Sequence, residues 1–252
     1  MAFLRSDLWD GRKHHLDRMT IRDLVRAYFA YPAIQTYLAL GVLSGAAAVY
    51  AWPGIGQAAA SVVATLLIYG LVWYVLHRFV LHGRYLFRSI HTAPVWKRIH
   101  FDHHSDPNDL GVLFGALHTT LPTIALATIP LGYLIGGVGG AATAFSVGLF
   151  TTCAYEFCHC IQHLSFTPKQ PWLKRIKRLH MAHHFHNEQG NYGITNFFWD
   201  KLFGSYYARV SETPPSPTVR NLGYTEAEYE RYPWVAELSG LKPKQSAAAG
   251  ED

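Results

Sequence analysis

The sequence predicts an all-α integral membrane protein whose four transmembrane helices form two hairpins beneath a helical cap on the cytoplasmic side. Half of the 252 residues are hydrophobic, and two long stretches, Ile34–Leu76 and Gly111–Tyr155, contain no Asp, Glu, Lys or Arg. A bilayer span needs about 20 apolar residues, so each stretch is too long for one span and suits two. Basic residues are confined to the segments outside these stretches.

Turn residues divide each stretch into two spans. The first contains WPGIGQ at 52–57 and the second GGVGG at 136–140, and Gly and Pro mark tight turns. We therefore expect spans at about 34–52, 58–76, 112–135 and 139–158. A soluble helical protein is the alternative, but the segment SVVATLLIYGLVWYVL at 61–76 shows no polar stripe at helical spacing.

The orientation of the spans follows from charge. All 22 Lys and Arg residues lie in 1–33, 77–110 or 159–252, and the two turns carry none. Positive charge stays on the cytoplasmic side, so both termini should be cytoplasmic. The sequence does not distinguish a bacterial inner membrane from the endoplasmic reticulum. The sequence pI of about 9.1 requires no nucleic-acid partner, because basic residues beside spans suit an anionic leaflet.

Three regions follow from this map. Residues 1–33 form a cytoplasmic or interfacial segment, with an amphipathic helix at 20–32; residues 34–210 form the four-helix membrane domain with its cap; residues 211–252 form a C-terminal tail. Within the cap, we expect the helix at 171–180 to turn Trp172, Ile176 and Leu179 toward lipid. The aromatic segment 191–204 is expected to pack as a lid under the cap.

Ten of the 15 histidines form a repeated pattern. A pair stands at the end of the second span in HRFVLH and another at the end of the fourth in HCIQH. Each pair is followed by a triplet, HFDHH and then HMAHH. The members are His77, His82, His100, His103, His104, His159, His163, His180, His183 and His184.

The spacings place most of these side chains on common helix faces. Residues three or four apart share a face, which covers both triplets and the pair His159–His163. His77 and His82 are five apart, roughly 140° around an ideal helix. That pair requires the helix to end or to distort.

Ten converging imidazoles predict a metal site on the cytoplasmic side. Neutral imidazole suits Zn, Cu, Fe and Ni, and ten ligands fit two ions with about five nitrogens each. The cysteines, Cys153, Cys158 and Cys160, have no CxxC spacing and are expected to pack as small apolar residues. Metal-bound histidines usually donate their other N–H to a carboxylate or carbonyl, so Glu156, Asp102 and His186 are candidates for supporting roles.

The four histidine motifs resemble the histidine boxes of the fatty acid hydroxylase and sterol desaturase superfamily. The stretch HMAHHFHNEQGNYGITNFFWDKLFGSYY extends the resemblance, which covers roughly 58–208 and is most similar to fatty acid 2-hydroxylases acting on sphingolipid acyl chains. The resemblance implies two metal ions, functionally iron although purified protein could hold zinc, with O2 as co-substrate and a membrane lipid as substrate. The sequence shows no haem motif, so it also implies a separate electron donor: a cytochrome b5-like protein, a ferredoxin or a reductase.

Other functions remain open at this point. A sterol or carotenoid hydroxylase, or a desaturase, shares the architecture and the first hydrogen abstraction. A membrane metal transporter is disfavoured, because its ligands would lie near the bilayer midplane, and the spans hold only His118 and Glu156.

Overall fold

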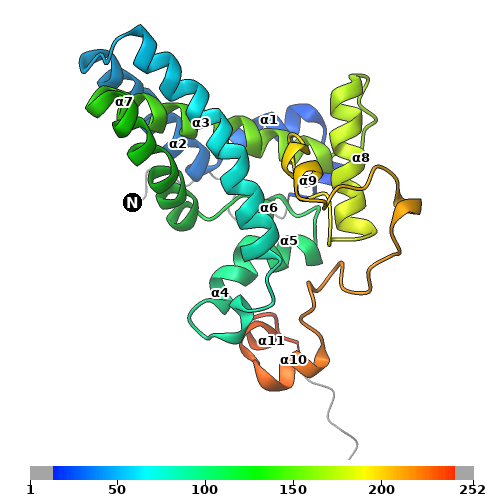
Figure 1. The fold of residues 1–252 in the computed structure, drawn as a ribbon. Helices are drawn as coiled ribbons and strands as arrows, with labels where there is room; N and C mark the ends of the chain where they lie inside the picture. The colour runs from blue at the N-terminus through cyan, green and yellow to red at the C-terminus, as the bar shows by residue number, and fades with distance from the viewer. Residues whose placement is uncertain (1–13, 242–252) are drawn as a thin grey trace, which may run out of the picture.

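The computed structural model describes residues 14–241, and its regular elements there are helices. Three are long: α2 (Pro32–Tyr50), α3 (Ile55–Val75) and α7 (Leu117–His163). Both α2 and α3 pack along α7, as Figure 1 shows. The segments Pro32–Tyr50, Ile55–Leu81 and Leu110–His163 are long and apolar enough to cross a membrane. The all-α class is confirmed.

Helix α7 is interrupted at Gly136 and Gly137. Gly137 has φ +59° and ψ −145°, a conformation that glycine adopts without steric cost. The chain reverses there, and the arms on either side come very close together. A Cβ atom built on Gly132 would lie only 2.3 Å from the carbonyl oxygen of Gly140. The two arms of α7 therefore lie side by side, and their turn packs against the loop between α2 and α3, where the Ala51 carbonyl touches Gly139.

The long helices carry apolar residues outward and small polar residues inward. Leu67, Leu126 and Leu134 are 65%, 77% and 84% exposed, whereas Thr65 and Thr152 are fully buried. A helix bundle in water has the opposite pattern. In a bilayer, lipid accepts the exposed leucines, and Ser and Thr side chains allow close helix packing.

This close packing leads to a prediction about glycine. Gly132→Ala should destabilise the protein by about 1–3 kcal/mol, the usual cost of overpacking, because the new methyl group would meet both Gly140 and Ala144. Gly56→Ala is the matched control, since nothing lies within 4 Å of a Cβ atom there. Unfolding midpoints in detergent titrated with SDS measure both. Equal midpoints for the two variants would contradict the close approach.

Helix α1 (Ile21–Ala30) confirms the amphipathic helix expected near the N-terminus. Thr20 and Asp23 form a capping box that begins it. Leu24 and Tyr28 are buried against the core, while Phe29 is exposed. The first thirteen residues and residues 242–252, parts of the expected N-terminal segment and C-terminal tail, lie outside the described residues.

Short elements gather at one end of the long helices (Figure 1), and this part of the molecule is called the cap below, without regard to its side of a membrane. The α-helices are α4 (Ala93–Trp96), α5 (Asp102–Ser105), α6 (Leu110–Leu113), α8 (Pro171–Phe185), α9 (Phe198–Leu202), α10 (Glu226–Arg231) and α11 (Trp234–Leu238). The 3-10 turns are η2 (Leu16–Arg18), η4 (Leu86–Arg88) and η6 (Val210–Glu212), and two π-helical turns are η3 (Leu76–Leu81) and η5 (Lys97–Phe101).

The expectation that the apolar side of α8 faces lipid is wrong for two of its three residues. Ile176 and Leu179 are buried and pack with Phe197 in a small core. Trp172 alone is exposed. The helix uses its apolar stripe to fix the second histidine triplet against the cap.

Candidate metal centre

The π-helical turn η3 brings His77 and His82, which are five residues apart, onto one face of the helix. A π turn bonds residues five apart, and here the His82 N–H donates to the His77 carbonyl at 3.1 Å. The two rings therefore share one face, with centroids 4.9 Å apart. The distortion that the sequence requires between these residues is confirmed.

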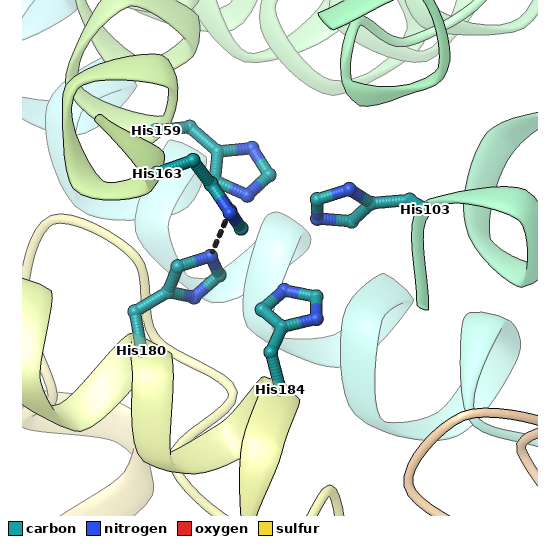
Figure 2. Close-up of side chains that lie close together, drawn as sticks. All are labelled: His103, His159, His163, His180 and His184. Atoms are coloured by element: carbon teal, nitrogen blue, oxygen red, sulfur yellow. Dashed lines mark hydrogen bonds between the residues drawn. The ribbon is translucent and has the colours of Figure 1, made fainter. Parts of the chain in front are cut away.

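The histidines gather into two neighbouring groups. The five-histidine group is His103, His159, His163, His180 and His184, and the four-histidine group is His77, His82, His104 and His183. Within each group, one ring nitrogen from every member lies within 4.8 Å of the others. Figure 2 shows the five rings of the first group pointing toward a common centre from α5, α7 and α8.

The tenth histidine, His100, lies beside the four-histidine group. Its Nε2 is 2.8 Å from Nε2 of His82. Each triplet thus contributes to both groups. His103 and His184 belong to the five-histidine group, whereas their chain neighbours His104 and His183 belong to the four-histidine group. His118 is exposed at the start of α7 and belongs to neither group.

The donor set fits metal ions. Every member of the five-histidine group has a buried ring nitrogen without a hydrogen-bond partner, and so do His104 and His183. Such orphaned groups are costly unless something binds them. His163 and His180 approach Nε2 to Nε2 at 3.0 Å. Ligands at about 2.0–2.1 Å from one ion lie roughly 2.8–3.4 Å apart at right or tetrahedral angles.

Backbone carbonyls orient three rings of the four-histidine group. Nδ1 of His77 bonds the Tyr192 carbonyl at 2.6 Å, that of His104 bonds Val219 at 2.9 Å, and that of His183 bonds Gly190 at 2.8 Å. A carbonyl can only accept, so Nδ1 carries the proton. Nε2 is left with its lone pair directed into the group, as a metal ligand requires.

Burial keeps the imidazoles of both groups neutral. It lowers the pKa of His183 to about 4, and it holds the pKa values of His104 and His184 well below their usual range. The neighbouring imidazoles lower the pKa values of His104 and His184 further, because adjacent positive charges repel. Neutral rings are the form that binds a metal.

The three supporting candidates occupy different places. The carboxylate of Glu156 is buried and accepts a hydrogen bond from the Gly115 N–H at 3.4 Å. Asp102 forms an ion pair with Lys97 at 2.7 Å. His186 Nε2 bonds the Thr213 carbonyl at 2.8 Å, toward the C-terminal segment. Of the three, only Glu156 lines the cavity described next.

An apolar cavity of about 230 Å³ ends at the histidines. Leu76 and Val80 of the α3–η3 segment line it, as do Thr119 and Thr123 of α7. Glu156 and six of the histidines also line it: His77, His100, His103, His159, His180 and His184. Its volume is large enough for part of a long apolar chain beside the ring nitrogens.

Sequence reasoning missed Asp200, which supports the site through the aromatic segment 191–204. Its buried carboxylate accepts hydrogen bonds from the N–H groups of Tyr192 and Gly193 and from the Ser205 hydroxyl, each at 2.8 Å. Burial raises the pKa of Asp200. These bonds fix the backbone that presents the Tyr192 carbonyl to His77. An acidic residue within a run of aromatic residues was the only signal.

The expected packing lid at 191–204 therefore has a more specific role. Its Tyr192 carbonyl orients one histidine, and the Ile194 carbonyl accepts a hydrogen bond from the Gln162 side chain at 3.1 Å, in the turn that carries His159 and His163.

Known proteins are similar to this chain in sequence and in fold. The fatty acid hydroxylase family model matches residues 62–205. The chain is 32% identical to the dihydroceramide fatty acyl 2-hydroxylase FAH2 of Arabidopsis thaliana, over 81% of this chain and 78% of that protein. It is 31% identical to the ceramide very long chain fatty acid hydroxylase SCS7 of Saccharomyces cerevisiae, over 56% of this chain and 36% of that protein.

A solved structure of full-length Scs7p, in which only the hydroxylase domain is visible, has a similar fold. The TM-score is 0.62 at 27% identity, over 75% of this chain and 69% of that chain. The chain thus spans about a third of the yeast protein in sequence and most of the visible hydroxylase domain.

Proposed function

Because the chain belongs to the fatty acid hydroxylase family, we propose that it is an O2-dependent lipid hydroxylase that modifies a fatty acyl chain at the carbon next to the carbonyl. One observation carries this proposal: two groups of buried imidazoles, most with an unpartnered nitrogen, meet the end of an apolar cavity between membrane-length helices. The names of the relatives, fatty acyl and ceramide hydroxylases, support the substrate class.

The ten histidines are proposed to hold two metal ions, functionally iron. His103, His159, His163, His180 and His184 would hold one. His77, His82, His104 and His183, with His100 beside them, would hold the other. Bound iron supplies the redox chemistry that activates O2, whereas zinc has none.

The reaction places one oxygen atom of O2 in a C–H bond and releases the other as water. Its balance requires two electrons and two protons, so the proposal includes an electron donor on the cytoplasmic side. The protein's own residues supply orientation and exclusion of water. The apolar walls at Leu76 and Val80 hold the chain, and the buried site keeps bulk solvent from the reacting carbon.

The position of attack follows from the depth of the site. The histidines lie in and directly after η3, which follows α3, near the C-terminal end of α7, and in the short elements η5, α5 and α8. A lipid that enters from the bilayer therefore brings carbons near its head group to the site, and its chain end extends away between α3 and α7. This geometry favours hydroxylation next to an acyl carbonyl.

The test is to express the chain with an electron-donor system and to locate new oxygen in the extracted lipids by mass spectrometric fragmentation. We expect one added oxygen at the carbon next to the carbonyl. Oxygen on a ring would point to a sterol or carotenoid substrate. A double bond without oxygen would point to a desaturase. Either result would refute the acyl 2-hydroxylase proposal.

We also propose four spans, with both termini and the histidines on the cytoplasmic side. The spans are α2, α3 and the two arms of α7, and the contact between Ala51 and Gly139 supports placing both turns at one end. Neither turn carries Lys or Arg, so the turns belong outside by the positive-inside rule.

Cysteine labelling from outside intact cells or vesicles tests this orientation. A cysteine at Val138, 66% exposed beside the second turn, should react with an impermeant reagent. A cysteine at Lys169, exposed in the cap segment before α8, should react only after the membrane is permeabilised. The unaltered chain gives the background from its own cysteines. External labelling at Lys169 would overturn the topology.

A further inference from the structure

The segment Thr213–Arg220, termed the C-terminal clamp below, crosses between the two HxxHH triplets. It lies beyond the residues that match the fatty acid hydroxylase family, which end at 205. It begins beside the end of α8, which carries His180, His183 and His184, and it reaches α5, which carries His103 and His104.

Three hydrogen bonds join the clamp to α5. Nδ1 of His104 bonds the Val219 carbonyl at 2.9 Å. The Arg220 guanidinium donates to the His104 carbonyl at 3.2 Å. The Ser105 hydroxyl donates to the Arg220 carbonyl at 3.2 Å. Both the ring and the backbone of His104 are therefore held by two consecutive residues of the clamp.

A second set of bonds joins the clamp to the end of α8. The Thr218 hydroxyl donates to the Glu188 carboxylate at 2.6 Å, and the Ser216 N–H donates to the His186 carbonyl at 2.8 Å. The side chain of Asn187 donates to the Pro214 carbonyl at 2.8 Å. Arg220 also lies 4.4 Å from the ring centre of Phe185, a cation–π distance.

The residues after the clamp fix its far end. Tyr224, Val235 and Ala236 are buried against Phe87 and Trp96 in a core separate from that of the long helices. Figure 1 shows α10 and α11 packed beside α4 at this end of the molecule. The clamp is therefore stretched between α8 and an anchored helical pair.

We propose that the C-terminal clamp positions His104 in the four-histidine group and so sets the metal affinity of that group. The inference rests on the proposed metal-dependent function. Val219 holds Nδ1 of His104, which leaves Nε2, buried and without a hydrogen-bond partner, directed into the group. Thr218 and Arg220 are positioning residues, because they hold the Val219 carbonyl in place.

The double variant Thr218→Val, Arg220→Ala tests the clamp. It removes two side-chain attachments and leaves every histidine intact. Loss of an orienting partner costs a metal ligand about 10–100-fold in affinity. We expect one of two metal equivalents to be released at a chelator concentration roughly 10–100-fold lower than in the unaltered chain, and the other to be unchanged. Elemental analysis after each chelator step measures this, and circular dichroism reports the helix content, which should not change.

Two further variants separate positioning from general stability. Thr218→Ser with Arg220→Lys keeps the hydroxyl and the positive charge and should restore most of the affinity. Arg231→Ala, an exposed basic residue on α10, should leave both metal equivalents unchanged. If the double variant releases both metal equivalents together, or neither of them, the proposed role of the clamp is refuted, and the proposed function is unaffected. An unaltered chain that binds no metal would overturn the clamp and the proposed function together.

Discussion

Replacing His103 by alanine is expected to lower the rate of lipid hydroxylation at least ~100-fold. His103 lies in the five-histidine group, and neither of its ring nitrogens has a hydrogen-bond partner in the structure. Changes that only disturb the orientation of a ligand cost about 10–100-fold, so removal of a ligand should cost more. His183→Ala should cause a comparable loss through the four-histidine group. Product formation per milligram of folded, purified protein is the measurement.

His118→Ala is the matched control. His118 is exposed at the start of α7 and lies outside both groups. Its replacement removes an imidazole of the same size from the same chain without touching the site, so the activity should stay within about 2-fold of the unaltered protein. Similar losses for His103→Ala and His118→Ala would mean that the ligand set is wrong.

Metal removal should abolish activity and should be reversible with iron. Nine imidazoles in two groups, eight of them buried, predict two ions per chain, bound by histidine nitrogen. The three cysteines stay free and lie outside both groups. After chelation, ferrous iron added without oxygen should restore turnover once O2 and reductant are supplied. Elemental analysis and activity on the same sample provide the measurement.

Reloading with zinc is the control for this experiment. Zinc accepts imidazole ligands in similar geometry but has no redox chemistry. Zinc-loaded protein should therefore contain two ions, keep its thermal stability and form no product. One ion or none in fully active protein would refute the dinuclear site, and turnover with zinc alone would refute the redox role.

The sequence was sufficient to identify the histidines and the long apolar segments, because both are local patterns. The length of an uncharged segment can be read directly, and the repeated HxxHH motif marks candidate metal ligands wherever it occurs in the chain. The distortion between His77 and His82 could also be inferred, because a spacing of five fits no regular α-helix face. The structure supplies the π-helical turn that resolves it.

The sequence could not assign each histidine to a group. His103 and His104 are neighbours in the chain but enter different groups, because adjacent helical residues point about 100° apart. The group that each histidine side chain enters depends on how α5 and α8 pack on the ends of α3 and α7. The error about α8 has the same origin, since an apolar stripe looks alike whether it meets lipid or a protein core.

The sequence by itself determined the candidate metal ligands: ten imidazoles at or beyond the ends of membrane-length segments, with all basic residues outside the apolar stretches. Only the tertiary structure decided how they are held. The partners that fix His77, His104 and His183 are backbone carbonyls of Tyr192, Val219 and Gly190. Because every residue has a backbone carbonyl, the type of side chain does not indicate which carbonyl will orient a histidine. It arises only when folding brings distant segments together.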